Sequence, residues 1–308
     1  MTALLLLPLL LPCALPVLAR WALARLAPAA ALWAVTGCAV VLGGCSLAAL
    51  GAFVLIGLLR LPLFAAFGEF VHPLRTAPAL IVVPAAATSV GVLAVCCWTS
   101  ARSVLRQGRA FRVARTEAGR RPAAGDLCVV DSPRPDAYAL PGRPHRIVVT
   151  TAMLRSLDGP EREALFAHER AHNEGGHHYF LAAAELAAHC HPALRPVRTT
   201  IRLAAERAAD EAAAARVGDR RLTARAIARA ALAGHDAGTP RPDFAAGAAT
   251  GPVPQRVQAL LGTPGRPRAG RAVAALLIAC TALSGAASAA GLVDFHHRVE
   301  VAQGEEAP

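Results

Sequence analysis

Four long apolar stretches divide this chain. They cover about residues 3–19, 30–59, 79–98 and 272–292. A helix needs about 20 residues to cross the hydrocarbon core of a bilayer, so each stretch predicts one transmembrane helix. The second stretch is long for one crossing but too short for two, which predicts a single tilted helix. No basic residue precedes the first stretch, so it lacks the charged start of a cleavable secretion signal and predicts a retained span.

The segment between the third and fourth stretches is polar and predicts a small sheet followed by helices. Residues 127–132 and 145–154 are rich in β-branched residues and predict strands, joined by an extended connection over 135–142. Apolar spacing and the bounding Gly and Pro residues predict four helices, from Asp158 to Gly175 and at about 178–190, 195–217 and 220–233. Residues 235–254 are rich in Gly, Pro and Ala and predict a mobile linker.

Together these elements predict an α-helical membrane protein with four transmembrane helices and an inserted domain of α+β type. Residues 1–98 form a membrane region with three transmembrane helices, and 99–271 form a mainly helical domain that includes the linker. Residues 272–292 form the fourth transmembrane helix, and 293–308 form a short external tail.

The composition favours a membrane protein and disfavours a nucleic-acid partner. Of the 308 residues, 55% are hydrophobic, and the mean hydropathy is positive. This is more apolar than an ordinary soluble domain. The formal net charge of +11 comes from arginine, because the 32 basic residues include no lysine. Such a bias is typical of a GC-rich genome more than of a nucleic-acid surface, so the lipid bilayer is expected as a partner and nucleic acid is not.

The arginines also indicate which side of the membrane the inserted domain faces. Basic residues are kept preferentially on the cytoplasmic side. Arg20 and Arg25 follow the first stretch, a run of arginines lies within 102–121 after the third, and the end of the chain is acidic. The predicted location is therefore the plasma membrane, with the inserted domain in the cytoplasm and the loop 60–78 and both chain ends outside.

The cysteines do not form a disulfide framework, since most of them fall in the apolar stretches. Cys190 lies in the sequence "HCHP", between His189 and His191. No second cluster at zinc-finger spacing accompanies it. A packing role at a helix end is therefore expected for Cys190, rather than a metal clip.

The sequence "HERAH" at residues 168–172 carries the strongest chemical signal. Residues four apart lie on one face of a helix, so His168 and His172 can both direct a nitrogen to one Zn2+ ion. Zinc lowers the pKa of a water that it binds towards about 7, and Glu169 can take the proton of that water as it attacks a peptide carbonyl. This predicts hydrolysis without a covalent intermediate. The bland alternative is a surface helix that happens to carry two histidines.

Two residues compete to be the third protein ligand, and His178 is the first. The longer pattern H-E-x-x-H-x-x-G-x-x-H ends at His178. On an unbroken helix, however, His178 would be turned away from His168 by about 80° and displaced by about 15 Å. Proteases with the longer pattern also carry a methionine turn downstream of the histidines, and the methionines here, Met1 and Met153, are both upstream. The longer match is interpreted as accidental.

Glu206 is the second candidate for the third ligand. A glutamate from a separate helix completes a site of two histidines and one glutamate, with the fourth position open to water. Asp210 lies one turn further on the same helical face, where it could accept the free N–H of a ligating histidine. The alternative is that Glu206 pairs with Arg202 or Arg207 as an ordinary solvated charge, which contributes little to stability.

The stretch "AYALPGRPHRIVVTTAMLRSLDGPEREALFAHERAH", followed by "ERAAD", resembles a known group of enzymes. These are the integral-membrane gluzincin metallopeptidases, specifically the BlaR/MecR antirepressor-type peptidases, which are related to the CAAX prenyl proteases and the HtpX-like peptidases. The resemblance covers roughly residues 80–235. It implies a zincin-like cytosolic domain, zinc ligands at His168, His172 and Glu206, catalysis by Glu169, and a supporting role for Asp210.

The resemblance also implies a type of substrate, and this chain departs from it in two respects. The implied substrate is a protein or peptide, such as a cytosolic transcriptional repressor or another membrane-proximal protein. His177 stands where the antirepressor-type proteins often have an acidic residue. About sixteen residues follow the fourth apolar stretch, so the extracellular penicillin-binding sensor domain of the antibiotic-sensing members is not expected.

The function predicted from the sequence is that of a membrane-embedded, zinc-dependent endopeptidase. The alternatives are a catalytically silent membrane scaffold that would not need Glu169, and an arginine-rich nucleic-acid-binding membrane protein whose binding would weaken steeply with salt. The extended "AYALPG" segment is expected beside the cleft, where it could pair with the substrate backbone as an added strand.

Overall fold

The computed structural model describes residues 2–58, 79–121, 123–235, 252–262 and 270–304. The predicted external loop 60–78 and most of the predicted linker 235–254 lie outside the described residues.

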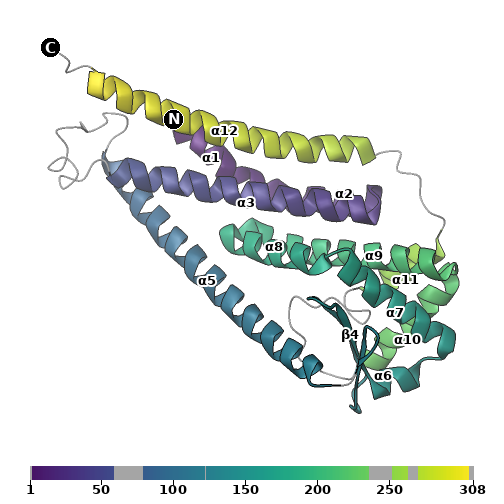
Figure 1. Ribbon diagram of the computed structural model, residues 1–308. Coiled ribbons are helices and arrows are strands. Elements are labelled where there is room, and N and C mark those ends of the chain that lie inside the picture. The colour runs from purple at the N-terminus through teal and green to yellow at the C-terminus, as the bar shows by residue number, and fades with distance from the viewer. Residues whose placement is uncertain (1, 59–78, 122, 236–251, 263–269, 305–308) are drawn as a thin grey trace.

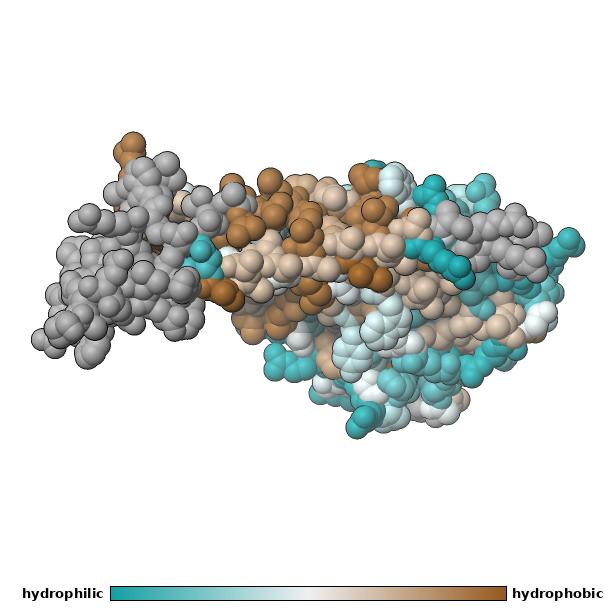
Figure 2. All heavy atoms as spheres, turned by 90° about the horizontal axis from the view of Figure 1, so that it is seen from above, coloured by the Kyte–Doolittle hydropathy of each residue, from teal (hydrophilic) through white to brown (hydrophobic). Residues whose placement is uncertain are grey.

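Among the described residues, four helical segments are long and apolar enough to cross a membrane: Leu4–Arg25, Pro28–Leu58, Val82–Gly119 and Gly270–Asp294. They correspond to the four apolar stretches of the sequence. In Figure 1 the first and last described residues lie towards one end of the molecule, and the sheet with its helices lies at the other. Apolar side chains gather over the long helices in Figure 2, and polar ones over the end that carries the sheet.

The first segment is built from α1 (Thr2–Leu10), a 3-10 turn (Leu11–Ala14) and α2 (Leu15–Arg25). Pro12 interrupts the regular helix, because proline has no N–H to donate to the carbonyl of Pro8. The hydroxyl of Ser46, on α3 (Pro28–Leu58), donates a hydrogen bond of 2.8 Å to that carbonyl oxygen. A backbone group that the proline leaves without its helical partner is thereby satisfied by the neighbouring helix.

Two of the long helices extend beyond the predicted spans. Helix α5 (Ala79–Gly119) continues about twenty residues past the predicted end at 98, and α12 (Gly270–Gly304) continues through most of the predicted tail 293–308. The change from apolar to polar residues marks the end of a hydrophobic stretch, but it does not stop a helix. In Figure 1, α5 leads away from α3 and reaches the sheet.

The sheet contains β1 (Ala123–Ala124), β2 (Leu127–Val130), β3 (Ala137–Leu140) and β4 (Arg146–Thr150), in the order β1-β2-β4-β3. β2 and β4 are parallel, whereas β3 is antiparallel to β4 and lies at the edge. The prediction of one strand over 145–154 was wrong in its second half. Thr150 ends the strand and caps α6 (Thr151–Ser156), because its side chain accepts a hydrogen bond from the N–H of Met153.

Five helices complete this end of the molecule: α7 (Gly159–Glu174), α8 (His177–Cys190), α9 (Val197–Val217), α10 (Arg220–His235) and α11 (Val253–Leu261). α11 includes the last residues of the predicted linker, and α10 includes its first residue, so the linker prediction was wrong at both ends. α8 packs along α3. The rings of Phe180 and Trp33 meet edge to face with centroids 4.7 Å apart.

The end of α8 lies against the middle of α3. A Cβ atom added at Gly43 would be 3.4 Å from the Cβ of Cys190 and 3.6 Å from a methyl carbon of Leu194. A methyl group at this position would make ordinary van der Waals contact, so only a larger side chain would press against the end of α8. Cys190 is the last residue of α8, and its neighbour His191 accepts a hydrogen bond from the N–H of Ala193. The histidine and cysteine at this position thus serve helix packing and capping.

Candidate metal centre

Helix α7 begins and ends at residues that the sequence marks clearly. The carboxylate of Asp158 accepts a hydrogen bond from the N–H of Glu161, and the N–H of Asp158 donates to the carboxylate of Glu161. This reciprocal arrangement is a capping box, and it satisfies two backbone donors at the start of the helix. Gly176 follows the helix with a φ of 60°, in the left-handed region that favours glycine. α8 can therefore turn back immediately and start at His177.

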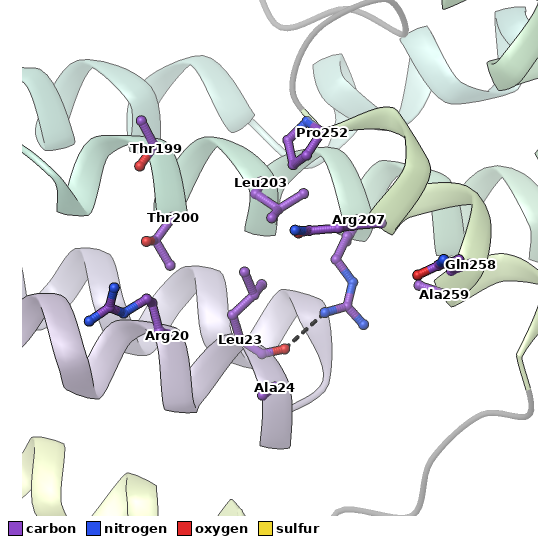
Figure 3. A pocket seen from close by; sticks show the side chains of 11 residues that line it. Arg20, Leu23, Ala24, Thr199, Thr200, Leu203, Arg207, Pro252, Gln258 and Ala259 are labelled. Atoms are coloured by element: carbon purple, nitrogen blue, oxygen red, sulfur yellow. Dashed lines mark hydrogen bonds between the residues drawn. The ribbon is translucent and has the colours of Figure 1, made fainter.

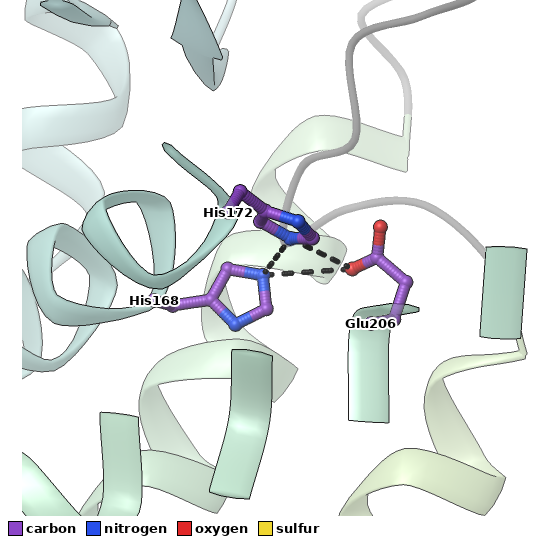
Figure 4. Close-up of side chains that lie close together, drawn as sticks. All are labelled: His168, His172 and Glu206. Atoms are coloured by element: carbon purple, nitrogen blue, oxygen red, sulfur yellow. Dashed lines mark hydrogen bonds and ion pairs between the residues drawn. The ribbon is translucent and has the colours of Figure 1, made fainter. Parts of the chain in front are cut away.

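Three side chains from two helices converge at a buried point (Figure 4). The Nε2 atoms of His168 and His172, both on α7, lie 3.1 Å apart. An oxygen of Glu206, on α9, lies 3.5 Å from the Nε2 of His168 and 3.8 Å from that of His172. Two ligands about 2.1 Å from a tetrahedral zinc ion are about 3.4 Å apart. The spacing of the three atoms therefore suits one metal ion.

The remote nitrogens of the two histidines also have partners. The Nδ1 of His168 lies 3.0 Å from a carboxylate oxygen of Asp210, and the Nδ1 of His172 lies 2.8 Å from the Nδ1 of His177. In a metal site, a partner of this kind fixes the tautomer and the ring orientation of a ligating histidine. When both Nδ1 atoms carry the proton, both Nε2 lone pairs point at the space beside Glu206.

Arg256, on α11, is fully buried beside the two carboxylates of α9. Its Nε and Nη2 donate to the two oxygens of Asp210 over 2.8 and 2.7 Å, and its Nη1 lies 3.0 Å from Glu206. A planar guanidinium can hold a carboxylate at two points, which fixes its orientation as well as its charge. Arg256 therefore positions Asp210, which in turn supports His168.

Electrostatics keep both carboxylates of α9 ionised despite their burial. Burial by itself raises the pKa of Glu206 and of Asp210, but Arg256 and the neighbouring histidines outweigh it and hold both pKa values below their usual range. Burial also opposes protonation of His168, yet the contacts with Asp210 and Glu206 raise its pKa to about 9. Burial and the nearby His172 lower the pKa of His177 to about 3, so this imidazole is neutral and its Nδ1 can accept a hydrogen bond from the Nδ1–H of His172.

The buried group fits a divalent cation in charge and in donor type. Glu169, Glu206 and Asp210 bring three carboxyl groups to a buried site beside the guanidinium of Arg256, so acidic groups are in excess there. Two imidazole nitrogens and one carboxylate oxygen are the donor set of a catalytic zinc site with an open position. Without a cation or a proton between them, the two facing nitrogen lone pairs would repel each other.

The structure brings together most, but not all, of the residues singled out from the sequence. His168, His172 and Glu206 form one group whose ligand atoms lie within 4.8 Å of one another. Glu169 is fully buried next to them on α7. His178 is outside this group, because its ring lies against Tyr179 with centroids 4.0 Å apart.

The suggestion that Glu206 is an ordinary solvated charge was wrong. Its side chain is fully buried, and it pairs with Arg256 and with the histidines. Arg256 was not identified from the sequence, and its only signal was an arginine between apolar positions in the nine-residue helix α11. The role of His177 was also missed, although its place in "GGHH" next to the metal motif was a possible signal.

A sequence model of peptidase family M48 matches residues 109–191. The matched part begins in the last third of α5 and ends one residue after α8. It includes His168, Glu169 and His172. This match supports a zincin-type metallopeptidase, and M48 metallopeptidases are metal-dependent, typically on zinc. Glu206, Asp210 and Arg256 lie outside the matched residues. No curated protein and no solved structure matches the chain.

Proposed function

We propose that this protein is a membrane-embedded zinc endopeptidase in which His168, His172 and Glu206 hold the metal. The observation that carries the proposal is the convergence of these three side chains, from two separate helices, at one buried point. The match to peptidase family M48 supports the same chemistry. The closer resemblance to the BlaR/MecR antirepressor-type peptidases is part of this proposal.

Each residue around the site has a role in peptide hydrolysis. Zinc, when bound, acts as a Lewis acid that polarises the scissile carbonyl and acidifies water. Glu169 accepts the proton of the attacking water and passes it to the leaving amine nitrogen, so that the peptide and water become a carboxylic acid and an amine. Asp210 and His177 keep the two imidazoles oriented, and Arg256 keeps Asp210 ionised.

The edge of the sheet offers a place for an extended substrate. β3 is the last strand in the order, so one of its edges pairs with no described strand. β3 also packs against α7, because Ala137 and Leu165 belong to one hydrophobic cluster. An extended peptide can add to an exposed sheet edge through backbone hydrogen bonds. We propose that the substrate binds along β3, which would bring its backbone to the helix that carries Glu169.

The proposed substrate is a protein close to the membrane, such as a cytosolic transcriptional repressor. This rests on the resemblance and on the four apolar helices, which suggest a membrane protein. The arginines beside these helices favour a plasma-membrane location with the catalytic domain in the cytoplasm.

Zinc content and casein cleavage of purified variants test the proposal. The unaltered protein is expected to bind about one zinc per chain. His168→Ala and Glu206→Ala should lose this zinc, whereas Glu169→Ala should keep it but no longer cleave labelled casein. His178→Ala is the matched control and should keep both properties. If His178→Ala lost the metal while Glu206→Ala kept it, the assignment of the third ligand would be wrong. Full casein cleavage by Glu169→Ala would remove the proposed role of that carboxylate.

A further inference from the structure

A pocket of about 690 Å³ lies between α2, α9 and α11, apart from the metal centre (Figure 3). Arg20 of α2 and Arg207 of α9 contribute to its lining, and none of the described lining residues is acidic. An excess of fixed positive charge in a concave site attracts anions. The pocket is therefore suited to a negatively charged ligand.

Arg207 is held in place at the pocket wall. Its Nη1 donates a hydrogen bond of 2.8 Å to the carbonyl oxygen of Leu23. Leu23 lies in the last turn of α2, where carbonyl groups lack helical partners. Figure 3 shows the guanidinium of Arg207 in the space between α2 and α11. A guanidinium has five N–H donors, so one bond to Leu23 leaves donors for a ligand.

The other polar lining groups can also donate hydrogen bonds. Thr200 on α9 contributes a hydroxyl, and Gln255 and Gln258 on α11 contribute amides, whereas the hydroxyl of Thr199 already donates to the carbonyl oxygen of Pro196. Phosphate oxygens accept hydrogen bonds from all three types of donor, and arginine recognises phosphate at two points. This donor set fits a phosphate group better than a carbohydrate or an apolar ligand.

The pocket lies at the end of a proposed membrane span. Arg20 belongs to the last turns of the segment Leu4–Arg25. Beside it, Trp21 is 45% exposed, and the guanidinium carbon of Arg25 lies 5.7 Å from the centre of its ring. Exposed tryptophan next to arginine is typical of the interface between lipid and water. The pocket is thus at the depth where phospholipid headgroups lie.

We propose that this pocket binds a phosphate-bearing anion, and that its occupant is the headgroup of an anionic phospholipid in the leaflet nearest the sheet. Basic pockets beside transmembrane helices are known to suit such headgroups. The proposal rests on the proposed insertion of α2 in a bilayer, but not on proteolysis. A headgroup there contacts both α9, which carries Glu206 and Asp210, and α11, which carries Arg256. Lipid binding therefore stabilises the docking of α11 against α9.

Lipid binding to the full chain in detergent tests the proposal. Native mass spectrometry would measure retention of dioleoyl phosphatidylglycerol, with dioleoyl phosphatidylcholine as the uncharged reference and inorganic phosphate as competitor. The unaltered protein should retain phosphatidylglycerol in preference. The double variant Arg20→Gln/Arg207→Gln should bind it about tenfold more weakly, because charge-assisted hydrogen bonds are lost. The double variant Arg25→Gln/Arg216→Gln removes the same charge outside the pocket and should keep the affinity.

A second variant separates binding from folding. Gln258→Glu keeps both arginines and the bond from Arg207 to Leu23, yet it adds a negative charge to the pocket, so it should also weaken phosphatidylglycerol binding. Equal losses in the two double variants would show general surface electrostatics and overturn the proposal. No preference for phosphatidylglycerol over phosphatidylcholine would overturn it as well. Displacement of the lipid by millimolar inorganic phosphate would identify free phosphate as the ligand and refute the lipid assignment. None of these outcomes depends on whether the protein cleaves peptides.

Discussion

Replacement of Arg256 by methionine is expected to destabilise the metal-free protein by about 3–5 kcal/mol, the usual cost of removing one partner of a buried ion pair. The guanidinium faces two buried carboxylates, Asp210 over 2.7 Å and Glu206 over 3.0 Å. At a charge separation of about 4 Å and an effective permittivity of about 20, each pair contributes about 4 kcal/mol of attraction. Methionine fills similar space but leaves both carboxylates without this compensation.

Zinc should recover part of that loss. A divalent ion at the two histidines and Glu206 brings back positive charge beside the carboxylates. It also stabilises the folded chain by mass action, because the unfolded chain has no assembled site. The assay is urea unfolding of the detergent-solubilised protein, followed by circular dichroism with and without a zinc chelator. The difference between Arg256→Met and the unaltered protein should be larger with the chelator present.

A surface arginine provides the matched control. Arg216 pairs with Glu174 over 3.1 Å, but both side chains are more than half exposed, at 52% and 61%. Such pairs contribute little, so Arg216→Met should change the free energy of unfolding by less than about 1 kcal/mol. In the double variant Arg256→Met/Asp210→Asn, the loss should be smaller than the sum of the single losses, because the two side chains interact directly. If Arg256→Met were as stable as Arg216→Met, the guanidinium would not hold the carboxylates as described.

Three further predictions concern the histidines and helix packing. His177→Ala should weaken zinc binding about 10- to 100-fold in competition with a fluorescent chelator, since His172 loses its partner, whereas His178→Ala should not. Zinc affinity should rise with pH until about pH 9 and then level off, because zinc binding must displace a proton from His168, whose pKa is raised to about 9. Calorimetry in two buffers would measure the released proton, and a zinc affinity that does not change with pH would contradict its release. Gly43→Leu should lower the free energy of unfolding in urea by about 1–3 kcal/mol, because the larger side chain would press against α8. Gly44→Leu should leave it unchanged, because the side chain would enter open space, and equal effects of the two variants would contradict the described packing.

Apolar runs, capping residues and helical spacing predicted those parts of the fold that depend on residues close together in the sequence. Each of the four apolar stretches became a helical segment long enough to span a bilayer, because about twenty apolar residues in helical form match the thickness of its hydrocarbon core, although the first segment is interrupted by a 3-10 turn. Helix α7 follows from its capping box, and the spacing of His168 and His172 follows from the helix itself. The approach of Glu206 to these histidines was inferred by analogy, since no local pattern brings α9 to α7.

Contacts between distant segments account for what the sequence did not predict. Arg256 is separated from Asp210 by the residues 236–251 that lie outside the described part, and no periodicity pairs an arginine on one short helix with an aspartate on another. The extension of α5 beyond residue 98 was missed for a different reason. Polarity sets where a span leaves the lipid, but it does not by itself stop a helix, and α5 continues to Gly119.

Helix α9 connects the apolar helices to the metal centre because its two faces differ. Ile201, Ala204 and Ala205 belong to one buried cluster with residues of α2, α3, α8 and α12. Glu206 and Asp210 lie on the face towards α7 and α11. The position of the third ligand relative to the two histidines is therefore set by packing on the long apolar helices, as well as by the domain that carries "HERAH". A change in how those helices pack would shift α9 and therefore move Glu206. The two histidines would keep their mutual distance, because both belong to α7.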